Sequence, residues 1–541
     1  MFINFSDIPG HQNLFLDYLN EFNKLKSFYK YNFRDRQEYP RVFKSVSESP
    51  RPFREDVANI INSQYSERKI SPKTAKNISL LKNKKTLAVV TGQQLGMLGG
   101  PMYTFYKIIT AIKLSQHLSE RYDEYEFVPV FWLEADDHDF DEIAYIKLIN
   151  DNNELVNIKY NDNAPEDINR GSVGYQKLLN SINSFFEDVE KNVRKTDFTK
   201  KIMDNLKTFY SEGKTFKQAF SNLLFWLFDQ HGLIIFDPQD KPVKRLLAPV
   251  FQKEISGFRE HTAKLVDVSA TLDELYHAQV KVRPVNLFLN YEEGRFLIEP
   301  VENEFRLRGK RKKYSFDELS SLIEAEPEKF SPNVLLRPIC QDYILPTAFY
   351  VGGASEIAYF AQVMSLYQIF DIPAPVIYPR SSATLVEKNI SSAIEKFDLN
   401  LQDIFAEPEK LKNNIISKMS EGSLENMFSK SAHEMELIFD KLQEKLFDID
   451  KTMSETENKY KQNSLNNLNQ LKSKALEAQK KKYETTLRQI DKITVNLYPD
   501  KNLQEREINF LFFANKYGLE VINKIYEELE INIFEHQVIY L

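Results

Sequence analysis

Four short apolar runs, each rich in β-branched or aromatic residues, interrupt a chain that otherwise carries its apolar residues at helical spacing. They are "TLAVVT" (86–91), "EFVPVFWLEA" (126–135), "GLIIFDP" (232–238) and "APVIYP" (374–379). Strands that alternate with helices predict a parallel sheet, because parallel neighbours must be joined by a crossover that usually contains a helix. We therefore expect an α/β fold built on a doubly wound parallel sheet.

Insertions are expected between these strands. The second run ends at residue 135 and the third begins at 232, whereas a crossover needs only about a dozen residues. The third and fourth runs lie still further apart. We assign 1–145 to an N-terminal helical region with the first half of the core. The rest of the core is assigned to 215–260 and 335–382, which leaves insertions at 146–214 and 261–334.

The composition changes after Pro379 to Lys, Glu, Asn and Gln with few Gly or Pro. Apolar residues there step by 4, 3, 4, 3 and 4, which is the spacing of a coiled-coil seam: Met435, Phe439, Leu442, Leu446, Ile449 and Met453. A weaker seam follows at Leu468, Leu471, Ala475 and Ala478. Joined near 455–464, the two seams fit either an antiparallel hairpin or one long helix with a defect. We expect 383–495 to be a coiled-coil domain that forms a homodimer, since apolar stripes of this length mark interaction surfaces. The segment 496–541 is expected to be helical and to pack back on the core.

The composition argues against two kinds of binding partner, nucleic acid and a membrane. The formal charge of −7 leaves no basic surface for nucleic acid, and no apolar run reaches the ~18 residues that cross a bilayer. The N-terminus "MFINFSDIPGHQ" lacks the pattern of a signal peptide, and the single cysteine, Cys340, forms no disulfide framework or Cys-rich zinc site. We expect a cytoplasmic protein that binds neither membrane nor nucleic acid.

Glycine is scarce in the chain, yet four of its 16 glycines fall between positions 92 and 100, directly after the first run. Their spacing fits neither the dinucleotide-binding motif nor the P-loop. A glycine turn between a strand and a helix points backbone N–H groups at a ligand, and the alternative is a turn whose glycines only permit close packing. We expect anion, substrate or nucleotide binding by Thr91, Gly92, Gln93, Gln94, Gly99, Gly100, Tyr103 and Lys107.

The second run ends in "WLEADDHDFDE" (132–142), which places six carboxylates around one histidine. Glu134, Asp136 and His138 share one side of an extended chain, so we predict acid–base or cation-assisted catalysis by these three and substrate or nucleotide binding by Asp139. A solvated helix N-terminus is the alternative, and it accounts for Asp141 and Glu142.

A third group lies in "NVLLRPICQDYILPTAFYVGGASEIAYFAQ" (333–362). Arg337 is a natural clamp for a carboxylate or phosphate, with structural pairing to an aspartate as its alternative. Gln341 and Asp342 are predicted to bind substrate or nucleotide beside it. Cys340 sits between apolar neighbours and is not expected to be a nucleophile. We predict one pocket bounded by 91–100, 134–139 and 337–342.

These segments, together with "NLQEREINFLFFANKYG" (502–518), resemble the BshC family of bacillithiol biosynthesis. The resemblance implies a Rossmann-like core related to class I nucleotidyl-transferring ligases, two connecting-peptide insertions, and a helical coiled-coil domain that makes a homodimer. It also implies a ligase that joins L-cysteine to glucosaminyl-malate, giving bacillithiol. Cys340 and "GGASE" depart from the family pattern inside the third motif.

Amide formation from a carboxylate needs activation, so a nucleotide (ATP or ADP) with Mg²⁺ fits the expected chemistry, although the sequence identifies neither a nucleotide nor a metal site. A rival from another class is a non-catalytic nucleotide-binding assembly protein whose coiled coil is the active part. The charged strand end beside a donor-rich loop favours the enzyme.

Overall fold

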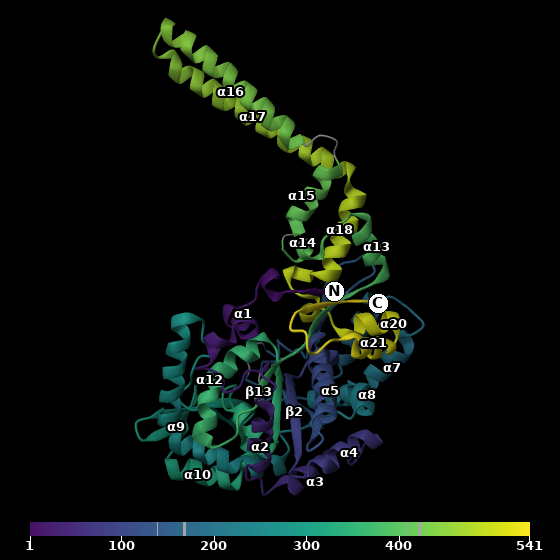
Figure 1. Ribbon diagram of the computed structural model, residues 1–541, viewed down its shortest axis with the longest axis vertical. Helices are drawn as coiled ribbons and strands as arrows, with labels where there is room; N and C mark the ends of the chain where they lie inside the picture. The colour runs from purple at the N-terminus through teal and green to yellow at the C-terminus, as the bar shows by residue number, and fades with distance from the viewer. Residues whose placement is uncertain (138, 166–168, 407, 420–423) are drawn as a thin grey trace. The chain divides into compact units, whose positions relative to one another are not determined.

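The computed structural model describes residues 1–137, 139–165, 169–406, 408–419 and 424–541. The chain forms two compact units. The first unit contains residues 1–385 together with 503–539, and the second contains residues 386–502. Figure 1 shows the elements of both units.

A five-stranded parallel sheet forms the centre of the first unit, with strand order β13-β12-β2-β3-β6. Four of these strands are the predicted runs: β2 (Thr86–Gln94), β3 (Glu126–Glu134), β6 (Ile234–Phe236) and β13 (Val376–Pro379). The expected α/β, Rossmann-like class is confirmed. The fifth strand, β12 (Thr347–Gly352), lies between two predicted neighbours and was missed as a strand.

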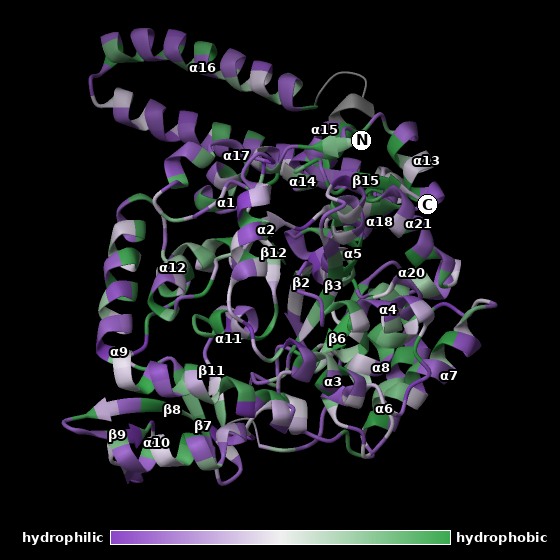
Figure 2. Cartoon of the chain, turned by 60° about the horizontal axis from the view of Figure 1, so that its bottom comes forward, coloured by the Kyte–Doolittle hydropathy of each residue, from purple (hydrophilic) through white to green (hydrophobic). Residues whose placement is uncertain are grey.

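Side chains on both faces of this sheet are covered. Leu87, Ala88, Val89 and Val90 of β2 are all fully buried, although successive side chains of a strand point to opposite faces. Helix α5 (Tyr103–Arg121) packs on β2 and β3, and α2 (Tyr39–Glu48) packs on β2 and β12. Figure 2 shows hydrophobic residues gathered around β3, β6 and the neighbouring α8 (Phe216–Phe228). The sheet is therefore the core that fixes the strand ends.

Long connections separate the strands. Between β3 and β6 lie the hairpin of β4 (Tyr145–Ile149) and β5 (Leu155–Lys159) and two helices before α8, namely α6 (Ile182–Asn192) and α7 (Thr199–Phe209). Between β6 and β12, the 35-residue helix α9 (Lys241–Leu275) runs without a break past residue 260.

An antiparallel sheet follows α9, with strand order β10-β9-β8-β7-β11. Its strands are β7 (Leu287–Tyr291), β8 (Gly294–Val301), β9 (Glu304–Leu307), β10 (Lys313–Tyr314) and β11 (Phe330–Pro332). Helix α10 (Phe316–Ala325) packs on this sheet, whereas α11 (Arg337–Ile344) and, after β12, α12 (Ala354–Phe370) pack against α9.

The two ends of the chain meet in a small sheet of the first unit, β1-β15-β14. Its strands are β1 (Phe2–Ile3), β14 (Ser382–Val386) and β15 (His536–Tyr540), and β15 was not expected from the sequence. The helices near the N-terminus are α1 (Asn13–Asn20), α3 (Arg54–Gln64) and α4 (Pro72–Leu80), and those after residue 502 are α19 (Gln504–Glu507), α20 (Phe510–Tyr517) and α21 (Glu520–Glu528).

The second unit is helical. Its elements are α13 (Lys388–Lys396), α14 (Leu401–Ala406), α15 (Pro408–Met419), α16 (Leu424–Ile449), α17 (Met453–Lys482) and α18 (Glu484–Leu497). Helices α16 and α17 form an antiparallel hairpin, as the pairs Gln443–Ser454 (3.2 Å) and Asp440–Lys461 (2.6 Å) show. The turn lies at residues 450–452, whereas the sequence placed the junction near 455–464, which is inside α17. Within the described part of the chain, no helix has both the length and the apolar character that crossing a bilayer requires.

Candidate functional site

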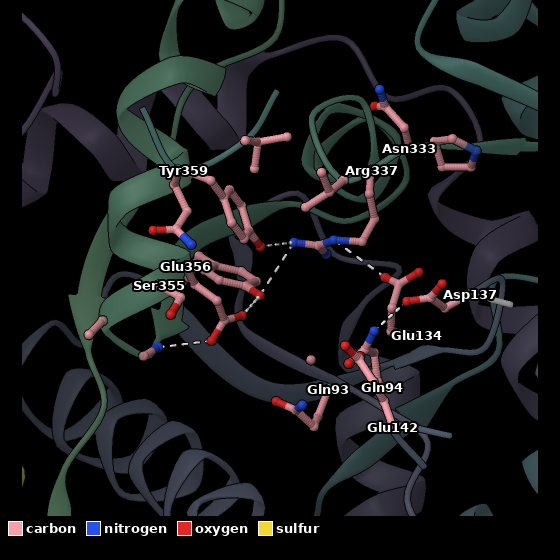
Figure 3. A pocket seen from close by; sticks show the side chains of 18 of the residues that line it. Gln93, Gln94, Glu134, Asp137, Glu142, Asn333, Arg337, Ser355, Glu356 and Tyr359 are labelled. Atoms are coloured by element: carbon pink, nitrogen blue, oxygen red, sulfur yellow. Dashed lines mark hydrogen bonds and ion pairs between the residues drawn. The ribbon is translucent and has the colours of Figure 1, made fainter. Parts of the chain in front are cut away.

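A cavity of about 840 Å³ lies in the first unit, at the ends of β2, β3 and β12 (Figure 3). Seven of the predicted binding or catalytic residues line it: Gly92, Gln93, Gln94, Tyr103, Lys107, Glu134 and Arg337. The three groups that the sequence analysis combined into one pocket therefore each contribute to it. His138 lies outside the described residues.

The glycines of residues 92–100, the glycine turn, do not all have the same role. Strand β2 continues through Gly92 to Gln94 instead of ending at residue 90 or 91. A Cβ on Gly92 would lie 3.0 Å from the carbonyl oxygen of Trp132 on β3, a tight contact that the backbone of β3 would have to relax to accept. Gly99 and Gly100 have φ of 87° and 70° and do not line the cavity. The alternative that these glycines only shape a turn therefore accounts for that pair, and Gly92 borders the cavity.

Lys107 is the buried cation of this wall. It comes from α5, is 2% exposed, and its Nζ contacts Glu356 (2.5 Å), the carbonyl oxygen of Gly92 (2.6 Å) and Oε1 of Gln93 (3.0 Å). Burial lowers the pKa of Lys107, and Glu356 acts in the opposite direction. Glu356 in turn accepts hydrogen bonds from the Tyr350 hydroxyl (2.5 Å) and the backbone N–H of Gly353 (2.8 Å). This network fixes Lys107 beside the end of β2.

Arg337 is oriented from several sides. Its Nη1 donates to Gln341 (2.9 Å), one Nη2 hydrogen bond goes to the Tyr359 hydroxyl (2.8 Å), and its Nε lies 3.3 Å from Glu134. Figure 3 shows the guanidinium between Tyr359 and Glu134. Such a fixed fork suits recognition of a carboxylate or phosphate.

Gln341 and Asp342 lie behind Arg337 and do not line the cavity. Both are fully buried, and Gln341 donates to Asp342 (2.8 Å), which also accepts a hydrogen bond from the Tyr367 hydroxyl. Burial raises the pKa of Asp342 to about 6. The predicted substrate-binding role is therefore replaced by a supporting one, because helix α11 turns its Arg337 outward and these two inward.

Three carboxylates line one side of the cavity, namely Glu134, Asp137 and Glu142 (Figure 3). Burial raises the pKa of Glu134 to about 7, against the lowering effect of Arg337. Gln94 donates a hydrogen bond to Asp137. Burial, with Asp139 and Asp137 nearby, also raises the pKa of Glu142. Glu134 thus has the near-neutral pKa that general acid–base catalysis needs.

Asp136 does not share the side of Glu134. Strand β3 ends at Glu134, and the Ala135 N–H turns back to the carbonyl oxygen of Leu133 (3.0 Å), so the alternation of an extended chain stops there. Asp136 is buried, pairs with Lys244 of α9 (2.8 Å) and accepts a hydrogen bond from Gln239 (2.9 Å). We no longer propose catalysis by Asp136.

Two other predicted residues also lie away from the cavity. The Thr91 hydroxyl is buried and donates to the carbonyl oxygen of Val351 (2.9 Å), and Asp139 accepts a hydrogen bond from the N–H of Glu142 (3.3 Å). Glu142, which the sequence analysis attributed to a solvated helix end, lines the cavity instead. No group of three or more His, Cys, Asp or Glu is placed to hold a metal ion among the residues that the structure describes.

Several residues of the cavity wall were not predicted from the sequence, including Arg295, Asn333, Glu356, Tyr359, Arg380 and Arg506. Arg380 directly follows β13, so the rule that pointed to Glu134 at the end of β3 would also have found it. Its guanidinium lies 5.6 Å from the ring centre of Tyr103. Cys340 is fully buried and burial raises the pKa of its thiol, which agrees with an inert cysteine.

Comparisons with known proteins cover nearly the whole chain. Residues 1–381 match the family profile described as "Bacillithiol biosynthesis BshC, N-terminal Rossmann-like domain", and residues 383–541 match the "C-terminal coiled-coil domain" of the same description. A protein of Salinibacter ruber is 32% identical over 97% of this chain and 96% of its own length. A protein of Chloroherpeton thalassium is 34% identical, again over 97% of this chain and 96% of its own. Both relatives carry the name "Putative cysteine ligase BshC".

Proposed function

Since the chain belongs to the BshC family, we propose that it is a ligase that joins L-cysteine to glucosaminyl-malate through an amide bond and so forms bacillithiol. The proposal rests on one observation. The same cavity contains a carboxylate whose pKa is near neutral and several cationic side chains that ion pairs or hydrogen bonds fix in position. Glu134 supplies the carboxylate, and Lys107, Arg337 and Arg380 supply the cations.

Amide formation sets two requirements that this wall can meet. An amine must lose a proton as its nitrogen attacks a carboxyl carbon, and the carboxyl group must be activated so that its oxygen leaves. In this proposal the ionised Glu134 accepts the proton. Arg337 and its neighbours would bind the carboxylates of the substrates and the negative charge that develops on the leaving oxygen.

Each cation is held before a substrate arrives. Arg337 has Gln341 and Tyr359 as hydrogen-bond partners, and Lys107 has Glu356. Groups held in this way need little reorganisation when charge develops, which is the main way in which polar sites accelerate acyl transfer. The cavity of about 840 Å³ has room for two small substrates.

A nucleotide with Mg²⁺ is part of the proposal as the activating group. When bound, it would convert a carboxylate into an acyl phosphate or acyl adenylate. The cations of the wall fit a phosphate. Since the described carboxylates are not grouped to hold a metal ion by themselves, Mg²⁺ would enter together with the nucleotide.

The test is to incubate the purified full-length protein with L-cysteine and glucosaminyl-malate and to follow bacillithiol by mass spectrometry. Parallel reactions contain ATP, ADP or no nucleotide, each with Mg²⁺. We expect product in at least one nucleotide reaction. Absence of product from all of them, with a folded protein that still binds nucleotide, would favour the non-catalytic assembly protein instead.

A further inference from the structure

The segment that follows the second unit returns to the cavity and contacts two of its walls. Residues 503–509 include Glu505, Arg506 and Asn509, of which Arg506 lines the cavity while Glu505 and Asn509 lie behind it. Glu505 is fully buried and Asn509 is 1% exposed. Glu505 contacts Arg380 of the proposed site, and Asn509 contacts the turn that precedes α5, the helix of Tyr103 and Lys107.

Glu505 holds Arg380. The Oε1 of Glu505 lies 2.6 Å from Nη2 of Arg380, and its Oε2 accepts the backbone N–H of Ala383 (3.0 Å). Burial acts to raise the pKa of Glu505, but Arg380 outweighs it and holds that pKa below its ordinary value. The pair is therefore ionised at neutral pH.

The Glu505–Arg380 pair keeps Arg380 separate from the second ion pair of the cavity, Glu356–Lys107. Glu356 also attracts Arg380 electrostatically, and Glu356 is the partner of Lys107 (2.5 Å). Because Glu505 lies behind the wall, it neutralises Arg380 without occupying the cavity. Without that carboxylate, Arg380 would still be attracted to Glu356, which would disturb the contact between Glu356 and Lys107.

Asn509 holds the glycine turn. Its Nδ2 donates to the carbonyl oxygens of Gly100 (2.7 Å) and Leu98 (3.1 Å), and its Oδ1 accepts the N–H of Leu511 (2.9 Å). The backbone beside it also pairs, because the Met102 N–H donates to the carbonyl oxygen of Ile508 (3.1 Å).

The turn needs an external partner. Leu98 has a φ of 48°, a left-handed conformation that costs energy for a residue with a Cβ. Helix α5 begins directly after the turn and carries Tyr103 and Lys107 into the cavity. A shift of the turn would therefore displace both side chains.

We propose that Glu505 and Asn509 are positioning residues of the ligase: Glu505 fixes Arg380, and Asn509 fixes the glycine turn that sets Tyr103 and Lys107. This inference rests on the proposed function for its effect on catalysis. The cavity is complete only when the chain has returned from the second unit, so the sequence motif 502–518 contributes to the site as well as to the fold.

The first experiment is a double-mutant cycle on product formation with Arg380→Gln and Glu505→Gln. A misplaced group can cost up to about a hundredfold in rate, and we expect Glu505→Gln to lower kcat at least tenfold. In the double variant, Glu505→Gln should add little to the loss caused by Arg380→Gln, because Glu505 acts through Arg380. Effects that multiply would overturn the assignment. The matched control is Glu507→Gln, whose carboxylate pairs with Lys147 (2.5 Å) and does not line the cavity.

The second experiment does not need ligase activity. Hydrogen–deuterium exchange of the full-length protein compares Asn509→Ala with Asn523→Ala, whose side chain donates to Glu520 within α21 (2.9 Å). We expect faster exchange at residues 96–107 in Asn509→Ala alone, under conditions in which both variants remain folded. Unchanged exchange there would overturn the role of Asn509, even if the wild-type protein forms no product and the proposed function fails.

Discussion

Glu134 is the side chain whose ionisation the cavity controls most directly. Burial raises its pKa to about 7, so near neutral pH it is partly protonated. If its carboxylate is the base, kcat should rise with pH through about 7 and level off above it. In Glu134→Gln this limb should disappear along with most of the activity. A wild-type profile that is flat between pH 6 and 8 would remove Glu134 from the proton transfer.

The same residue predicts how stability depends on pH. Since the pKa of about 7 in the folded chain lies above the ordinary 4.5, the folded state binds an extra proton between these values. Stability should therefore fall as pH rises from about 5 to 7, by at most about 3 kcal/mol from this one group. Glu134→Gln should remove that part of the decline. Urea denaturation of both proteins at pH 5 and pH 8 measures it, and an equal decline in the two would contradict the raised pKa.

At the scale of elements, the sequence predicted where the strands end better than it predicted where the side chains after those ends point. Apolar runs predicted β2, β3, β6 and β13, because burial on both faces leaves a continuous apolar signal. Asp136 was placed beside Glu134 because alternation was continued past the end of β3, where the turn at Ala135 reverses the chain. Nothing local in the sequence could show this reversal.

Other features could not be predicted from the sequence, because they depend on contacts between segments that are far apart along the chain. Strand β12 is apolar, but it was taken as part of a motif and not as a strand. Gln341 and Asp342 were correctly grouped with Arg337, yet only the fold shows that they support it from behind. Glu505 and Asn509 act on residues more than a hundred positions away, so no local spacing signals their role.

The glycine turn gives a prediction at this scale. Gly99 and Gly213 both have a positive φ, of 87° and 82°. A Cβ on Gly99 would lie 2.8 Å from the ring of Phe105, whereas nothing lies within 4 Å of one on Gly213. Gly213→Ala should cost about 1 kcal/mol for the backbone alone, and Gly99→Ala clearly more. Thermal denaturation compares the two, and equal losses would show that packing around Gly99 is not tight.

At the scale of the whole molecule, the hairpin of α16 and α17 leaves apolar residues in water. Ile438, Leu442 and Ile449 lie on one face of α16 and are 59%, 48% and 77% exposed. Figure 2 shows hydrophobic residues interspersed along this helix. We propose that a second copy of the chain covers this face, which would give the homodimer expected from the sequence.

Light scattering tests the dimer. The wild-type protein should have twice the 63.4 kDa mass of the chain. Ile438→Asp with Leu442→Asp should weaken association without unfolding the first unit. The exposed pair Glu436→Ser with Glu444→Ser, which lies on another side of α16, should not. A single 63.4 kDa species at tens of micromolar wild-type protein would contradict the proposal.

The claim that one cavity of the first unit carries the ligase chemistry is tested most directly by rates of bacillithiol formation in two matched variants. Glu134 and Glu126 stand at opposite ends of β3, and Glu126 is exposed and far from the cavity lining. We expect Glu134→Gln to lose at least about a hundredfold in kcat at pH 7, while Glu126→Gln retains the wild-type rate. Equal rates in the two variants would contradict it.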